Sequence, residues 1–127
     1  MIQVQRLAIA GWCALAVISS AHAAGDESAG AKTFAQCAAC HQVGPDAQNT
    51  VGPILNGIVG RPAGTYPGYR YSSAMRKSGL TWDEATLTQY LRGPEKMVPG
   101  TKMAFAGVAS DQDLADLIAY LKRQGPQ

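Results

Sequence analysis

Strong charge of either sign is absent from this sequence. Of its 127 residues, 11 are Lys or Arg and 9 are Asp or Glu, so the formal net charge is only +2. Proteins that bind nucleic acid usually present a strongly basic face, and this balance therefore argues against nucleic acid as a partner. The chain is also short and has neither an internal repeat nor a low-complexity tract. These features together predict a single domain.

A long apolar run is missing as well. The N-terminal run LAIAGWCALAVIS, from Leu7 to Ser19, has 13 residues, whereas a helix needs roughly 20 to cross a bilayer. Arg6 precedes this run, and the small-residue pattern Ala21-His22-Ala23 closes it. That layout is typical of a secretory signal peptide rather than of an uncleaved membrane anchor. We therefore expect residues 1–23 to be removed and residues 24–127 to form one domain in the periplasm.

Histidine and cysteine are scarce in the mature chain. Its two cysteines and one histidine all lie in FAQCAACHQVG, as Cys37, Cys40 and His41. A structural zinc site needs four such ligands, and no second pair is present. A Cys-x-x-Cys redox site usually opens a helix in a strand–helix–strand setting, whereas this pair follows a helical stretch. A structural disulfide would leave His41 without a role.

The pattern Cys-x-x-Cys-His in an exported chain is the attachment signature of c-type haem. Cys37 and Cys40 would form thioethers with the haem vinyl groups, and His41 would reach the iron from one face. The predicted cofactor is therefore one covalently attached haem c. The ligand on the other face decides the function, because an open site would bind small gases or peroxide, whereas a Met thioether would favour electron transfer.

Three methionines of the mature chain could supply that second ligand. Met103 lies in VPGTKMAFAG, where Pro99 and Gly100 impose an irregular loop that can turn a side chain inward. Met75 and Met97 are more simply interpreted as core residues, because methionine often fills gaps in apolar cores. The residues favour Met103 without excluding the other two.

Hydrophobic spacing predicts an all-α fold with an irregular middle. We expect a first helix over Ser28–Cys40, a second from near Thr81 to Gly93-Pro94, and a last helix that opens on Ser110. The stretch 44–68 is rich in Gly and Pro and shows no sustained alternation. So long a loop normally counts against a compact domain, but a haem wrapped by the loop would supply the missing core.

In these segments the sequence resembles a class I cytochrome c, of the exported bacterial type close to the mitochondrial protein. The resemblance rests on GAKTFAQCAACH, VGPILNGIVGR, YPGYRYSSAMRKSGLTW, YLRGPEKMVPGTKMAFAG and DLIAYLK, which occur in the family's order. It implies a small all-α fold in which the N- and C-terminal helices cross, with Gly30 at their contact and loops wrapped around the haem. It also implies that His41 and Met103 are the proximal and distal ligands of the iron.

The resemblance assigns further residues to the haem environment. The carbonyl of Pro53 would accept the second ring N–H of the proximal histidine, as metal-bound histidines usually require. Three side chains would hold a haem propionate: Arg61, Tyr71 and Trp82. Tyr90 and Thr101 would supply polar groups near the distal ligand and the propionate. Met75 replaces a polar Asn often found at this position, and we hypothesise that it makes the haem wall drier and alters the reduction potential.

The function implied by the resemblance is that of a soluble, monomeric one-electron carrier, not an enzyme, in a respiratory or photosynthetic chain. Its donor would be a bc1-type complex or a dehydrogenase, its acceptor an oxidase or a reductase, and contact with membrane complexes would be transient. Six basic residues could form a docking rim around the haem edge: Lys32, Arg70, Arg76, Lys77, Lys96 and Lys102. The alternative, that most of them are ordinary solvated residues, stays open. Two rival classes remain as well: a gas sensor or haem peroxidase would need an open distal site, and a thiol oxidoreductase would carry no haem.

Overall fold

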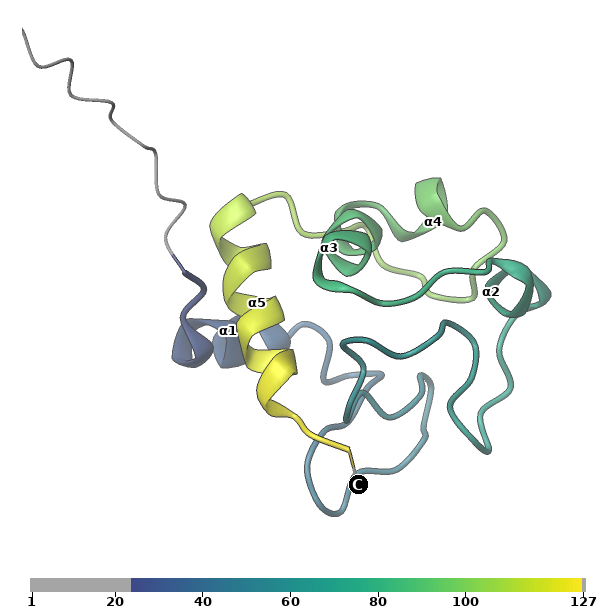
Figure 1. Ribbon diagram of the computed structural model, residues 1–127, viewed down its shortest axis with the longest axis horizontal. Helices are drawn as coiled ribbons and strands as arrows, with labels where there is room; N and C mark the ends of the chain where they lie inside the picture. Colours follow the sequence, from purple (N-terminus) through teal and green to yellow (C-terminus); the bar gives the residue numbers. More distant parts are fainter. Residues whose placement is uncertain (1–23, 127) are drawn as a thin grey trace, which may run out of the picture.

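The regular elements of this chain are helices, as the computed structural model shows for the residues it describes, 24–126 (Figure 1). They are α1 (Glu27–Phe34), α2 (Ser73–Lys77), α3 (Glu84–Arg92), α4 (Pro94–Met97) and α5 (Asp111–Arg123). Within this range, antiparallel pairing is confined to an isolated bridge between Pro62 and Thr81. The predicted all-α fold is confirmed. The predicted signal peptide lies outside the described residues, and none of the helices in 24–126 has the length and apolarity to cross a membrane.

Helices α1 and α5 cross at a glycine, as expected (Figure 1). Gly30 is buried in this crossing, and a Cβ on it would lie 2.0 Å from the backbone oxygen of Asp116. No larger residue fits without separating the two helices. Next to the crossing, the rings of Phe34 and Tyr120 pack with their centroids 5.3 Å apart. The segment before α1 is bound to the same helix, because the backbone N–H of Asp26 donates to a carboxylate oxygen of Asp116 at 2.7 Å.

Each of the three longest helices is preceded by a capping residue. Its side chain accepts the backbone N–H of the residue three positions later, a group that the helix itself leaves unpaired. These capping residues are Asp26, Asp83 and Ser110. The predicted start of the last helix is therefore confirmed. The helix predicted to begin near Thr81 is α3, and it begins three residues later, at Glu84. The reason is that Thr81 and Trp82 are extended: Thr81 pairs with Pro62, and the N–H of Trp82 donates to the carbonyl of Arg61 at 2.9 Å.

The end of the first helix also differs from the prediction. We expected it to reach Cys40, but α1 ends at Phe34 and the chain continues in tight turns. There, the N–H of Cys37 donates to the carbonyl of Phe34 at 2.7 Å, and that of Cys40 donates to Cys37 at 3.1 Å. Bonds to the third residue back wind the chain at three residues per turn, so that residues three apart lie above one another. The turns therefore bring Cys37 and Cys40 to the same side of the chain.

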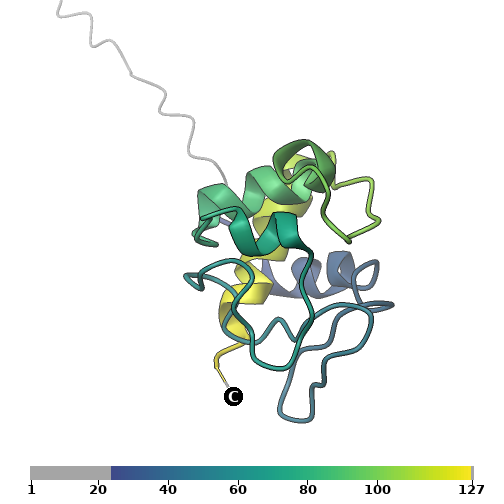
Figure 2. The ribbon, with the colours of Figure 1, turned by 90° about the vertical axis from the view of Figure 1, so that its right-hand side faces the viewer.

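The stretch between His41 and Ser72 has no helix, in agreement with the irregular stretch predicted over 44–68, and it loops around the lower and right-hand part of the molecule (Figures 1 and 2). The loop is held in shape by hydrogen bonds within itself and by one to the end of the chain's last helical region. Asn49 donates to the carbonyl of Pro67 at 3.1 Å, and the N–H of Gly57 donates to the carbonyl of Gln124 at 2.6 Å. The loop thus forms one wall of the space that α1, α3 and α5 enclose from the other sides.

Candidate functional site

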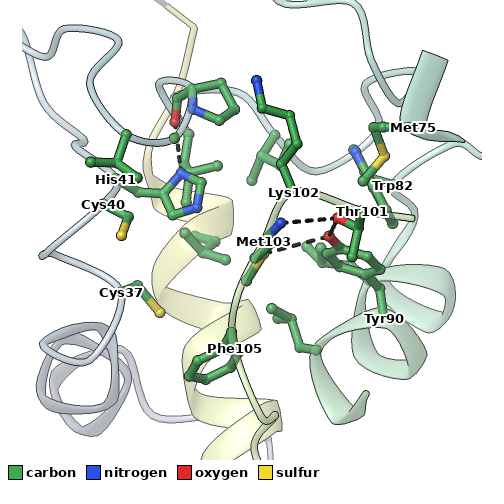
Figure 3. A pocket seen from close by; sticks show the side chains of 18 of the residues that line it. Cys37, Cys40, His41, Met75, Trp82, Tyr90, Thr101, Lys102, Met103 and Phe105 are labelled. Atoms are coloured by element: carbon green, nitrogen blue, oxygen red, sulfur yellow. Dashed lines mark hydrogen bonds between the residues drawn. The ribbon is translucent and has the colours of Figure 1, made fainter. Parts of the chain in front are cut away.

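A cavity of about 250 Å³ lies between the helices and the loops (Figure 3). Much of its wall is apolar or aromatic, with side chains from α1, α3, α5 and the intervening segments: Phe34, Leu55, Ile58, Trp82, Leu87, Leu91, Phe105, Leu117 and Leu121. Of the ten site residues predicted from the sequence, all but Arg61 line this cavity: Cys37, Cys40, His41, Pro53, Tyr71, Trp82, Tyr90, Thr101 and Met103. Segments far apart in the chain therefore converge on one site.

Cys37 and Cys40 both line the cavity, and no disulfide joins them. Figure 3 shows their sulfur atoms on the same side of the site as the imidazole of His41. Burial raises the pKa of the Cys37 thiol, and the neighbouring Cys40 raises it further. Until a cofactor is attached to it, the Cys37 side chain is therefore a neutral thiol. Two thiols at this spacing can tether one edge of a flat cofactor to the backbone.

The ring of His41 has a defined proton position. Its Nδ1 lies 2.8 Å from the carbonyl oxygen of Pro53, and a carbonyl can only accept a hydrogen bond. Nδ1 must therefore carry the proton, which leaves the lone pair of Nε2 for a metal. Burial lowers the pKa of His41, and the hydrogen bond to Pro53 opposes this only in part. The environment thus favours the neutral ring that metal ligation requires.

Gly52, which the sequence reasoning did not single out, packs directly against this ring. A Cβ at Gly52 would lie 2.3 Å from Cε1 and 2.6 Å from Nδ1 of His41. Its own N–H donates to the carbonyl of Cys40 at 2.8 Å, which holds the glycine beside the haem-attachment motif. The available signal was its position immediately before Pro53. Gly52 therefore shapes the slot in which the imidazole lies.

Met103 reaches into the cavity from another side, and two polar residues orient it (Figure 3). The hydroxyl of Tyr90 donates to the thioether sulfur at 3.5 Å and lies 3.1 Å from the hydroxyl of Thr101. The N–H of Met103 donates to the same Thr101 hydroxyl at 3.3 Å. Of the other two methionines, Met75 lines the cavity from α2, and Met97 does not line it. The expected neighbours of Met103 are thus in place.

Arg61 lies behind the cavity wall rather than on it. Its guanidinium donates to the carbonyls of Ile54 at 3.0 Å and Asn56 at 3.2 Å, and it lies 4.7 Å from the centroid of the Tyr66 ring. Of the three residues predicted to hold a propionate, the structure brings Tyr71 and Trp82 to the cavity and keeps Arg61 outside it. Arg61 therefore supports the backbone that carries Pro53.

This set of donors fits a tethered metalloporphyrin better than a bare metal ion. Within residues 24–126, no group of three or more His, Cys, Asp or Glu side chains could hold a metal. What the site offers instead is an apolar cavity with two thiols, one imidazole with a free lone pair and one thioether. Those are the groups that a covalently attached haem needs for its two vinyl groups and for the iron.

Comparisons with known proteins agree with this chemistry. The family model described as cytochrome c matches residues 27–124. The chain is 53% identical over 122 residues to a cytochrome c2 of Rhodomicrobium vannielii, covering 96% of this chain and 97% of the relative. It is 47% identical over 118 residues to a cytochrome c2 of Blastochloris viridis, covering 93% of each.

Solved structures show the same relationship. Cytochrome cH from Methylobacterium extorquens superposes with a TM-score of 0.74 at 52% identity, covering 78% of this chain and 99% of the other. Cytochrome c2 from Rhodospirillum centenum superposes with a TM-score of 0.75 at 37% identity, covering 80% of this chain and all of the other. This chain therefore belongs to the cytochrome c family, and it is an electron-transfer protein, not an enzyme, that carries one covalently attached haem c.

Proposed function

We propose that His41 and Met103 ligate the haem iron from its two faces, and that the protein is a soluble carrier in the periplasm. The observation that carries the proposal is that a hydrogen bond orients each of these two side chains. Nδ1 of His41 is committed to Pro53, and the Met103 sulfur is held by Tyr90, at different sides of one cavity. The redox partners of such a carrier would be a bc1-type complex or a dehydrogenase as donor and an oxidase or a reductase as acceptor.

The bound haem would supply a reversible one-electron couple, and the residues of this chain would keep electron transfer to and from it fast. The hydrogen bond to Pro53 fixes the imidazole of His41 and makes it a better donor. Tyr90 orients the thioether and uses only one of its lone pairs. Because both ligands would be held in place in either oxidation state, little geometry has to change when an electron enters or leaves. The apolar wall excludes water from the same space.

The ferric protein itself tests this ligation. We expect the weak long-wavelength absorption band that is characteristic of methionine bound to ferric haem, and slow reaction of the ferrous protein with carbon monoxide. A ferrous protein that bound carbon monoxide at once, with no such band in the ferric form, would instead have an open distal site and support a gas sensor or a peroxidase.

The proposal of export rests on the predicted leader, residues 1–23, with cleavage expected after Ala23. Gly25 already packs on α5, since a Cβ on it would lie 2.1 Å from the backbone oxygen of Ala115. Packing on α5 is therefore already present two residues after the predicted cleavage site between Ala23 and Ala24. N-terminal sequencing of the protein from its native host should begin at Ala24. A chain that retained residues 1–23 would argue for an anchored carrier.

The surface around the cavity is suited to an acidic partner. No Asp or Glu occurs between residues 47 and 82, whereas Arg70, Arg76 and Lys77 are exposed there. Exposed Lys102 lines the cavity mouth and lies 5.2 Å from the centroid of the Tyr69 ring. Within residues 24–126, the ion pairs use other cations: Arg92, Lys122 and Arg123. The basic rim is therefore not neutralised by the protein's own carboxylates.

Salt should slow electron exchange with such a partner. For the charge-reducing variant Lys102→Gln, we expect the low-salt bimolecular rate with a purified acidic redox partner to fall about threefold, because steering charges act mainly on the encounter rate. Stopped-flow kinetics at increasing ionic strength measures this. The matched control is Lys122→Gln, since Lys122 pairs with Glu84 at 3.1 Å on α3 rather than lining the cavity mouth. Equal effects of the two variants would mean that the rim residues are simply solvated.

Met75 is buried in the cavity wall, with 8% of its surface exposed. For Met75→Asn we expect a lower midpoint potential, because a polar amide beside the haem stabilises the more positively charged ferric state. Met97→Asn is the matched control, since Met97 does not line the cavity. Redox titration of both variants and the native protein measures the effect. An unchanged potential in Met75→Asn would refute the hypothesis of a drier wall.

A further inference from the structure

The hydrogen bond between His41 and Pro53 is one rung of a short ladder. Two segments run beside one another here, residues 40–44 and residues 52–56. The carbonyl of Cys40 accepts the N–H of Gly52 at 2.8 Å, and the ring of His41 meets Pro53 at 2.8 Å. The next rung joins the N–H of Leu55 to the carbonyl of Gln42 at 3.1 Å. The imidazole is therefore held within a paired stretch of backbone rather than by a single contact.

The last rung of this ladder is made by a side chain. The amide of Asn56 donates to the carbonyl of Gly44 at 2.8 Å and accepts the N–H of Gly44 at 2.9 Å. Asn56 is only 7% exposed, and it is one of two buried polar residues in the described part of the chain, the other being Asp116. The two bonds thus pair both backbone groups of Gly44 with one side-chain amide. A buried amide with both of its functions paired in this way fixes a local geometry.

We infer that Asn56 is a positioning residue for the proximal ligand, which closes the ladder and thereby keeps the carbonyl of Pro53 on Nδ1 of His41. The inference rests on the proposed ligation of the iron by His41. Its physical basis is that the backbone hydrogen bonds of Gly52 and Leu55, on either side of Pro53, fix the path of the segment and so the direction of the Pro53 carbonyl. Arg61 braces the same segment from its other edge, because it binds the carbonyls of Ile54 and Asn56.

The consequence for function is a control on the reduction potential. When the carbonyl accepts the ring proton firmly, the imidazole is more basic and stabilises ferric iron. When the ladder loosens, that hydrogen bond weakens and the ferrous state gains relative stability. Asn56 would therefore lower the midpoint potential of the native protein without lining the haem cavity.

The experiment compares Asn56→Ala with Asp116→Ala in the holoprotein. Asp116 is equally buried, and it also accepts a backbone N–H, that of Asp26, but it belongs to the crossing of α1 and α5. Proton NMR of the ferrous protein follows solvent exchange of the His41 ring N–H, and redox titration gives the potential. For Asn56→Ala we expect exchange about tenfold faster, the factor that corresponds to ~1.4 kcal/mol of lost hydrogen bonding, and a higher potential. Asp116→Ala should change neither quantity.

Each outcome separates the inference from the proposed function. A native protein in which the His41 ring proton shows no haem ring-current shift would overturn His41 ligation itself. A native protein that shows the shift, with equal exchange and potential in both variants, would overturn the role of Asn56 alone. If Asn56→Ala does not fold, native-state exchange of the unmodified protein decides. The Gly44 N–H, the Leu55 N–H and the His41 ring N–H should then share one opening free energy, and unrelated values would refute the ladder.

Discussion

The variant Met103→Ala should retain its covalently bound haem but lose both the methionine band and much of its reduction potential. A thioether is a soft, weak donor that favours ferrous iron, whereas the space left by alanine admits water, which favours ferric iron. We expect a fall on the order of a few hundred millivolts, part of the roughly 0.8 V range over which axial ligands set haem potentials. Redox titration and the ferric absorption spectrum measure the two effects.

The control for this result is Met97→Ala, which removes the same side chain at the end of α4, outside the cavity. It should leave the band and the potential unchanged while costing some stability. The Met103 variant should also bind carbon monoxide in its ferrous form, because its distal face would be open. If Met103→Ala kept the native spectrum, another side chain would be the distal ligand, and Met75 would be the first to consider because it lines the same cavity.

The contrast between Met103 and Arg61 shows what a local sequence pattern can and cannot predict. Cys37, Cys40 and His41 line one cavity, as the pattern predicted, because their relative positions depend on five consecutive residues. Met103 reached the same cavity because Pro99 and Gly100 begin the irregular loop that carries it. The resemblance also places Arg61 beside a propionate, which stays a prediction, and the structure adds that its guanidinium donates to two backbone carbonyls. Those carbonyls belong to an irregular segment whose path no periodicity predicts.

The residues that sequence reasoning missed share that cause. Gly52 and Asn56 bind residues about twelve positions earlier in the chain, Cys40 and Gly44. These contacts depend on the path of the whole intervening loop, which no local pattern predicts. The end of α1 was wrong for a related reason, since helical composition continues to Cys40 while the hydrogen bonds change to tight turns. Helices with strong apolar spacing and a capping side chain, such as α5, were predicted well because both signals are local.

The variant Gly52→Ala should disrupt the proximal side of the site most severely. Its methyl carbon would lie 2.3 Å from Cε1 of His41, far inside van der Waals contact, so either the ring or the loop must move. Movement of the ring would break the hydrogen bond to Pro53 and displace Nε2. We expect a loss of about 3 kcal/mol in the free energy of unfolding, at the upper end of the cost of overpacking. Denaturant unfolding and the yield of low-spin holoprotein measure these effects.

The cause of this loss would be steric, and the control is chosen to show it. Gly52 is not among the glycines with positive φ, so its backbone accepts alanine without conformational strain. Gly93 likewise has an extended φ of −165°, but the nearest atoms to a Cβ there belong to the flexible Lys96 side chain, at an ordinary contact distance of 3.4 Å or more. Gly93→Ala should therefore fold and bind haem like the native protein. If Gly52→Ala did the same, the imidazole would not occupy the slot that Gly52 leaves for it, and the proximal half of the proposed ligation would have to be abandoned.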